Sequence, residues 1–181
     1  MPSILIQPVP PYDDRAMKGL ISPLREAFGI PATVSPTSVI DPAFAFDVNR
    51  NQYNSTSLIS SFLELYAHFD GKVIAVSSVD LFVPVLTYVF GEAQLDGPIA
   101  VVSSHRLDET LYGLASNPHL LQERLIKEAV HELGHTFGLI HCRDYACVMH
   151  SSTTVEDIDV KSERFCSMCA EQLGVKVRTD R

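Results

Sequence analysis

The chain is 181 residues long, which is the size of one ordinary globular domain with a core of its own. Hydrophobic residues make up 46% and charged residues 20%, a balance that excludes a disordered, collagenous or low-complexity chain. The formal net charge of -8 argues against nucleic acids and anionic membrane surfaces as partners, because both attract basic proteins.

The first two thirds of the chain alternate short apolar runs with helical patterns, which is typical of an α/β fold built in layers. The patterns predict strands over 4–7, 32–39, 73–79 and 99–103, helices over 13–28 and 55–69, and a loop over 49–54. The apolar stretch 81–93 is interrupted by Pro84 and Gly91, which predicts an edge strand or a loop over an edge. No internal repeat and no flexible linker divides the chain, so we expect a single domain over 1–181.

A longer helix is predicted next, because Asn117 can cap free amides and Pro118 is well suited to the first helical position. We expect this helix to run to about Phe137. His131 and His135 lie one turn apart on one face of it, so both imidazoles point at one spot. An apolar residue recurs every four positions on a different face, which would pack on the core: Leu121, Leu125, Ala129 and Leu133.

Gly138 would end the helix with a left-handed turn, and the chain could then bend back to bring His141 to the same spot. Three neutral imidazoles suit Zn²⁺, and three protein ligands leave the fourth tetrahedral position for water or substrate. Glu132 follows the first histidine and can reach a bound water, accept its proton and pass that proton to a leaving amine. The spacing therefore predicts zinc-dependent hydrolysis, with His131, His135 and His141 as metal ligands and Glu132 as the catalytic residue.

The cysteines all lie in the last quarter of the chain, at Cys142, Cys147, Cys166 and Cys169. Four thiolates in two close pairs can form a closed tetrahedral zinc site, which has no open position and therefore a structural role. Such a site would tie the segment after His141 to the C-terminal stretch, where little apolar sequence exists to form a core. Two disulfides are the alternative. The N-terminal residues show no basic region and no cleavage site, so we expect a cytoplasmic protein, in which disulfides are disfavoured.

The string from His131 to His141, His-Glu-Leu-Gly-His-Thr-Phe-Gly-Leu-Ile-His, resembles the extended signature of the metzincin zinc peptidases. Met149 is similar to the methionine of the Met-turn, which lies beneath the metal site in that clan. Together with the four cysteines, the motif resembles the archaemetzincin family of metzincin metalloproteases. The resemblance implies a catalytic zinc on the three histidines, Glu132 as general base and acid, and a second zinc on the cysteines.

The resemblance also implies parts of a substrate cleft. In metzincins an edge strand beside the cleft binds extended peptide by strand addition, and residues 88–93 are the candidate for that strand. The segment 151–165 would supply the cleft wall beyond Met149. We interpret its acidic run of Glu156, Asp157 and Asp159 as a solvated loop, and His150 as a surface residue. Three further histidines have no ligand partner at a useful spacing: His68, His105 and His119.

The sequence thus predicts an α/β (α+β) metzincin-like domain. A mixed twisted sheet with two long helices would form an upper subdomain of about 1–138, and a small zinc-stapled lower subdomain would follow over about 139–181. The predicted function is peptide-bond hydrolysis by zinc-activated water, with two zinc ions per chain, one catalytic and one structural. The alternatives are a non-catalytic zinc-stabilised peptide-binding module, against which the intact Glu132 counts, and an amidohydrolase acting on a non-peptide amide. We expect a monomer whose partner is a peptide or protein substrate.

Overall fold

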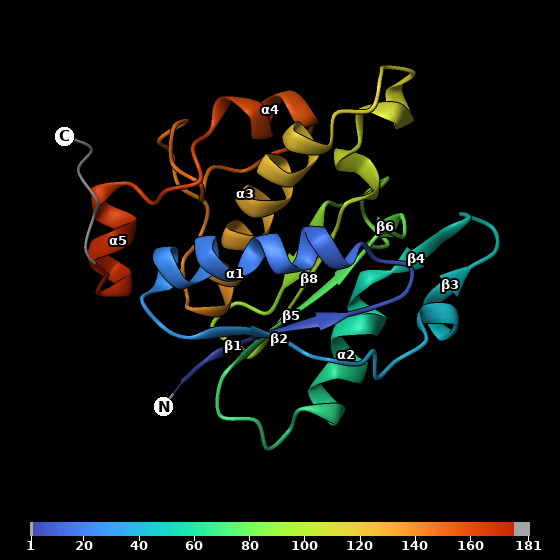
Figure 1. Ribbon diagram of the computed structural model, residues 1–181, viewed down its shortest axis with the longest axis horizontal. Coiled ribbons are helices and arrows are strands. Elements are labelled where there is room, and N and C mark those ends of the chain that lie inside the picture. Colours follow the sequence, from blue (N-terminus) through green and yellow to red (C-terminus); the bar gives the residue numbers. More distant parts are fainter. Residues whose placement is uncertain (1, 176–181) are drawn as a thin grey trace.

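The computed structural model of the protein describes residues 2–175. Its central sheet has the strand order β2-β1-β5-β8-β7. Four of these strands run parallel, whereas β7 is antiparallel to β8 and forms one edge of the twisted sheet (Figure 1). The strands of this sheet are β1 (Ile4–Pro8), β2 (Ala32–Val34), β5 (Lys72–Ser77), β7 (Gly91–Ala93) and β8 (Ile99–Ser103).

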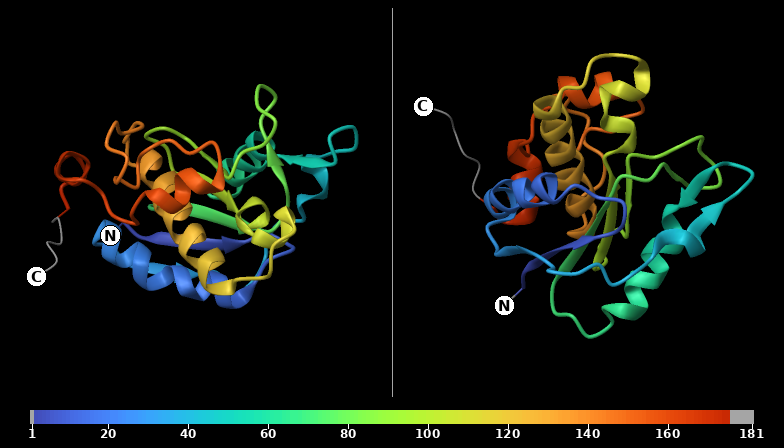
Figure 2. Two further views of the ribbon diagram at one scale, coloured as in Figure 1. Left: turned by 90° about the horizontal axis from the view of Figure 1, so that it is seen from above. Right: turned by 45° about the vertical axis from the view of Figure 1, so that its right-hand side comes forward.

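Helices cover both faces of the central sheet (Figure 2). The first and third α-helices pack on one face and the second packs on the other. Side chains of β5 point alternately to the two faces of the sheet, which gives the protein two core layers. Ile74 and Val76 pack under α1 and α3, whereas Val73 and Ala75 pack under α2. The α-helices are α1 (Asp14–Phe28), α2 (Ser55–Leu65), α3 (Pro118–Thr136), α4 (Val155–Val160) and α5 (Ser167–Leu173), with short 3-10 helices at Pro42–Ala45, His105–Leu107 and Glu109–Tyr112.

The two long helices begin and end where their capping residues predict. The Asp13 carboxylate accepts hydrogen bonds from the first amides of α1, and Gly29 ends that helix with a φ of 68°. At α3, the side-chain oxygen of Asn117 accepts from the Leu120 amide at 3.2 Å, and Pro118 is the first helical residue. The local signals in the sequence therefore fix both helices that pack on this face of the sheet.

Several of the predicted elements have different bounds in the structure. The helix predicted over 55–69 ends at Leu65, and the strand predicted over 73–79 is β5, Lys72–Ser77. The strand predicted over 32–39 ends at Val34, because Pro36 has no amide to continue the ladder with β1. The loop predicted over 49–54 is wrong in its second half, where Gln52–Asn54 forms β4. The polar Gln52 is buried there, and its side-chain amide donates to the Asp80 carboxylate at 3.0 Å. This hydrogen bond takes the place of the one that an exposed glutamine would make with water.

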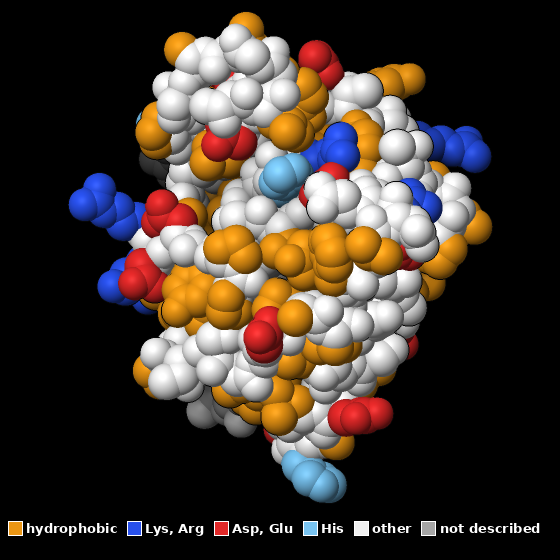
Figure 3. Space-filling view, turned by 90° about the vertical axis from the view of Figure 1, so that its right-hand side faces the viewer, with side chains coloured by type: hydrophobic (Ala, Val, Ile, Leu, Met, Phe, Trp, Pro, Cys, Tyr) orange, Lys and Arg blue, Asp and Glu red, His pale blue; other side chains and the backbone are white. Residues whose placement is uncertain are grey.

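β4 is the middle strand of a second, three-stranded sheet, β3-β4-β6, in which β3 is Phe46–Asp47 and β6 is Leu81–Phe82. Hydrophobic side chains form a band across the middle of the face on which this sheet lies (Figure 3). The sheet and its flanking loops carry several exposed hydrophobic residues: Phe44, Phe46, Val48, Val85 and Leu86.

The segment after Gly138 contains no strand within the described residues, and it lies against the end of α3 (Figure 1). The solvated loop expected around Glu156 is wrong, because α4 forms there, with Thr154 and Asp157 as a capping box at its start. The Asp159 carboxylate joins α4 to α3 through the guanidinium of Arg124, with an N–O distance of 2.7 Å. Across residues 2–175, every helix is too short or too polar to cross a membrane.

Candidate active site

The side chains of His131, Glu132 and His135 all come from the last turns of α3. Lys72 of β5 holds this end of the helix. Its Nζ donates to the carbonyl of Thr136 at 2.6 Å, where the helix has no further amide to offer. The helix end that carries the predicted site is thereby fixed to the central sheet.

Gly138 turns the chain back after α3, as its position predicts, with a φ of 87° in the left-handed region. The turn brings His141 to the two helix histidines. One ring nitrogen from each of His131, His135 and His141 lies within 4.8 Å of the others. The structure therefore brings together the three histidines that the sequence spacing predicted to form one cluster.

Hydrogen bonds determine which nitrogen of each helix histidine faces this point. Nδ1 of His131 lies 2.8 Å from the carbonyl oxygen of Val148, and Nδ1 of His135 lies 2.7 Å from that of Leu139. A carbonyl only accepts, so both Nδ1 atoms carry the proton. Burial lowers the pKa of both imidazoles, which favours their neutral form. The two Nε2 lone pairs then face each other across 3.1 Å, a repulsive arrangement that a cation between them relieves. This donor set fits Zn²⁺.

Glu132 is buried between α3 and β7. Gly91 of β7 approaches it so closely that a Cβ at position 91 would lie 2.6 Å from Cγ of Glu132. Burial, and then the negative charge of Glu128, raise the pKa of Glu132 well above its usual range. A carboxylate with a raised pKa is a stronger base, which suits proton transfer.

Sequence reasoning missed a buried ion pair one helical turn before Glu132. Nζ of Lys161, at the end of α4, lies 2.8 Å from the carboxylate of Glu128, and the two side chains are 0% and 4% exposed. The helical spacing of Glu128 and Glu132 could have indicated the first residue. Lys161 carries no comparable signal, because its partner is distant in the sequence.

A cleft runs past the histidines between two rims. Residues 86–93, which include β7, form the upper rim together with Leu95, and residues 151–153 form much of the lower rim. The Tyr88 hydroxyl donates to the carbonyl of Thr153 at 2.8 Å and joins the two rims. The expectation of an edge strand over 88–93 is confirmed for Gly91–Ala93, which borders both the sheet and the cleft.

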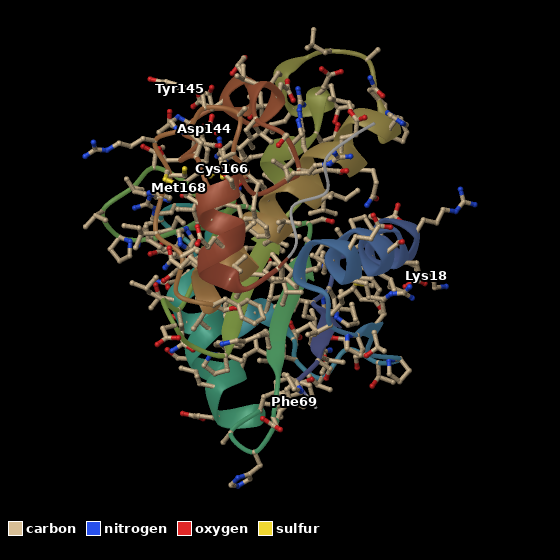
Figure 4. All side chains as sticks on the ribbon, turned by 90° about the vertical axis from the view of Figure 1, so that its left-hand side faces the viewer. Lys18, Phe69, Asp144, Tyr145, Cys166 and Met168 are labelled. Atoms are coloured by element: carbon tan, nitrogen blue, oxygen red, sulfur yellow. The ribbon has the colours of Figure 1, made fainter. Side chains whose placement is uncertain are left out.

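The four cysteines form a second cluster, with their sulfur atoms within 4.8 Å of one another. All four are free thiols, so the disulfide alternative is not met. Cys166 lies beside the segment that carries Asp144 and Tyr145 (Figure 4), and its Sγ is 3.8 Å from that of Cys142. Burial raises the pKa of Cys147 to about 11, so this thiol holds its proton unless a cation replaces it.

Met149 is fully buried beneath α3, against Gly134, where a Cβ would collide with its sulfur. The methionine therefore packs against the last turns of α3, the helix that carries His131 and His135. His150 is only partly buried, and its Nδ1 contacts the carbonyl of Cys142 at 2.9 Å. The structure places the remaining histidines outside the cluster: His68, His105 and His119.

Comparison with known proteins agrees with this geometry. Residues 31–175 match the family model described as Peptidase family M54. The archaemetzincin of Methanocaldococcus jannaschii is 38% identical over 170 residues, which cover 94% of this chain and 92% of that protein.

Two solved structures share the fold. A zinc-dependent peptidase from Methanocorpusculum labreanum superimposes with a TM-score of 0.84 at 26% identity, over 94% of this chain and 99% of that one. The archaemetzincin of Methanopyrus kandleri superimposes with a TM-score of 0.80 at 33% identity, over 96% of this chain and 94% of that one. The predicted α/β fold with a mixed twisted sheet is therefore confirmed.

Proposed function

Because the chain belongs to the archaemetzincins, peptidase family M54, and is a zinc-dependent metallopeptidase, we propose that it hydrolyses peptide bonds with Glu132 as general base and acid. The observation that carries this proposal is the position of Glu132, buried at the cleft beside the three clustered histidines. Glu128, the nearest carboxylate on the same helix, is committed to Lys161. Glu132 is therefore the better placed of the two to exchange a proton with a substrate.

His131, His135 and His141 would hold the catalytic zinc. When bound, zinc supplies Lewis-acid chemistry, because it polarises the scissile carbonyl and makes a water molecule more acidic. The backbone carbonyls of Val148 and Leu139 hold both Nδ1 protons, which would leave the Nε2 atoms of the two helix histidines free to bind the ion.

The peptide would lie extended along β7, where the backbone of an edge strand can pair with an added strand. The Glu132 carboxylate accepts a proton from the attacking water and delivers it to the nitrogen of the leaving amine. Its raised pKa supports this role, since a stronger base takes the proton more readily. Contact with Gly91 fixes where the carboxylate can lie.

We further propose that the four cysteines hold a structural zinc, which gives two zinc ions per chain. The four sulfur atoms are close enough to bind one ion, and four protein ligands leave no open position for a substrate. The backbone amide of Cys166 donates to Sγ of Cys147 at 3.3 Å, which stabilises a thiolate there.

We propose one metzincin-like domain over 1–181, with an upper subdomain of about 1–138 and a lower subdomain that follows it. The helix that supplies Glu132 belongs to the upper part, whereas His141 and Met149 belong to the lower part, so the cleft lies between the two. The net charge of -8 favours a peptide or protein substrate over nucleic acid, and we propose that the chain acts as a monomer.

The test is cleavage of a diverse peptide pool, read by mass spectrometry, with the native chain and Glu132→Gln at matched zinc content. An amide cannot accept the proton, so new peptide termini should appear only with the native chain. Identical spectra for the two proteins would instead favour a binding module or a hydrolase of non-peptide amides.

A further inference from the structure

The residues of β7 alternate in the direction that their peptide groups face. The amide of Gln94 donates to the carbonyl of Ile99 at 3.0 Å, so Gln94 faces β8. In an antiparallel ladder every second residue repeats this pattern, so Glu92 also faces β8. Gly91 and Ala93 therefore direct their N–H and C=O groups outward, into the cleft.

The side chains of β7 alternate between the two faces of the sheet. Gly91 faces Glu132 on the α3 side, so the carboxylate of Glu92 projects on the α2 side. A substrate strand paired antiparallel with Gly91 and Ala93 would place one residue directly opposite Glu92, in a pair without hydrogen bonds. Cα atoms in such pairs are only about 4.5 Å apart, so the two side chains meet.

The Glu92 carboxylate is fixed in place but not neutralised. It accepts hydrogen bonds from the hydroxyl groups of Ser55 and Thr56, at the start of α2, with a distance of 2.9 Å from Thr56. The ion pairs of residues 2–175 do not include Glu92. Hydroxyl donors leave the full negative charge, and the two carboxylate oxygens can still accept from a further donor.

We propose that Glu92 is a specificity-determining residue that favours substrates with a cationic group at the position opposite it. That group is either a Lys or Arg side chain or a free amino terminus, both of which supply N–H donors with a positive charge. The inference rests on the proposed function, because it takes the edge of β7 as the place where the substrate lies. Of the other carboxylates in the cleft, Glu128 already has Lys161 as its partner, and Glu132 is assigned to proton transfer.

Two peptide series test this specificity. The first carries an acetylated amino terminus and places Lys, Arg, Gln or Glu at each position around the cleaved bond. The second carries Gln throughout and a free amino terminus. We expect one position to favour a cation, with kcat/KM on the order of fivefold higher than for the neutral peptide, and a weaker preference at high salt. A preference in the first series assigns the side chain as the cation, and one in the second series assigns the terminus.

Variants separate the charge of Glu92 from its structural contacts. Glu92→Gln retains hydrogen-bond acceptors for Ser55 and Thr56, and it should reduce the ratio of kcat/KM between cationic and neutral peptides to about one. Glu92→Lys should reverse the ratio in favour of acidic peptides. Glu64→Gln removes an exposed charge elsewhere on α2 and serves as the matched control, with an unchanged ratio.

Binding to zinc-loaded Glu132→Gln supplies a readout that does not depend on cleavage. The same peptides should bind this variant with the same preference, and adding Glu92→Gln should abolish the preference. Equal affinities for cationic and neutral peptides would overturn the role of Glu92, as would a preference that survives Glu92→Gln. Absence of cleavage by the native chain, with the binding preference intact, would count against the proposed hydrolysis alone.

Discussion

The hydroxyl of Tyr88 donates to the backbone carbonyl of Thr153 at 2.8 Å and so joins the upper rim of the cleft to the lower rim. Further contacts fix both residues of this hydrogen bond in place. The guanidinium of Arg106 lies 4.2 Å from the centre of the Tyr88 ring, and the Asp157 carboxylate accepts from the Thr153 amide at 2.8 Å. Because the contact spans the cleft that the peptide would follow, we expect it to limit how far an extended peptide can continue there.

We expect Tyr88→Phe to favour long peptides, because it removes the hydrogen bond and retains the ring. A neutral hydrogen bond contributes about 1 kcal/mol, so the ratio of kcat/KM between long and short peptides should rise by up to about fivefold. Tyr66→Phe is the matched control, since the Tyr66 hydroxyl donates to the Gln7 side chain and neither residue lines the cleft. A length series with equal ratios in native chain and Tyr88→Phe would contradict a limiting contact.

Gly91→Ala should impair catalysis without removing zinc. The added Cβ would lie 2.6 Å from Cγ of Glu132 and 2.7 Å from the backbone oxygen of Val101, so the carboxylate and the β7 backbone beside it must both shift. A displacement of about 1 Å at a reacting group can reduce the rate by about 100-fold, and we expect a fall in kcat of that order. Gly19→Ala is the control, because its Cβ meets only the flexible end of Gln122. Unchanged kcat in Gly91→Ala would argue against Glu132 as the base.

His135→Ala should reduce the zinc content from two ions per chain to one. The histidine and cysteine clusters share no residue, so the cysteine cluster should keep its ion. Elemental analysis of the purified variant measures this directly. Loss of both ions together would show that the two sites depend on each other.

Cys166→Ser should lower stability rather than act on the chemical step. It removes one of the four sulfur atoms of the cluster, and binding to a structural zinc site stabilises the folded chain. We expect the Tm to fall by at least about 5 °C, which corresponds to about 2 kcal/mol in a chain of this size. The neighbouring Ser167→Ala should leave the Tm nearly unchanged. After chelation the native chain and Cys166→Ser should melt alike, and a persistent gap would exclude a zinc-dependent effect.

The stability of the metal-free chain should depend on pH through His131 and Glu132. Burial lowers the pKa of His131 below 6.5, so between that lowered pKa and 6.5 the unfolded chain binds more protons, and stability falls as the pH falls. The contribution is at most about 1.4 kcal/mol per pH unit. Burial raises the pKa of Glu132, so above 4.5 the folded chain binds more protons there, which opposes the loss.

Urea unfolding of the metal-free chain between pH 7.5 and pH 5 separates these two effects. Glu132→Gln removes the opposing carboxyl group, so the variant should lose more stability than the native chain as the pH falls below 6.5. Parallel curves for the two proteins would contradict a raised pKa at Glu132.

The sequence predicts those parts of the molecule that local signals specify. Asp13 and Gly29 bound α1, Asn117 starts α3, and the left-handed turn at Gly138 returns the chain toward α3, each through backbone chemistry within a few residues. The grouping of the histidines follows from the same helix and turn. The spacing of the motif is therefore sufficient to predict their geometry.

Long-range contacts account for what the sequence does not predict. Gln52 can be buried in β4 because its side-chain amide donates a hydrogen bond to the Asp80 carboxylate. The two residues are far apart in the sequence, so no local pattern predicts this contact. The ion pair of Lys161 with Glu128 and the fit of Gly91 to Glu132 likewise depend on tertiary packing. A helical periodicity of four could have indicated Glu128, but Lys161 has no pattern to reveal it.

The central sheet also has a consequence for how the chain folds. β1 pairs with β5, yet α1, β2, β3, β4 and α2 all lie between them in the sequence. To pair these two strands, the chain must close a large loop and lose conformational entropy before the strand contacts can stabilise it. Contacts of this kind make folding slow. α3 buries its apolar face on this sheet, so we expect the histidine cluster to form among the last parts of the molecule. Zinc in the medium would then trap the completed fold rather than guide its early steps.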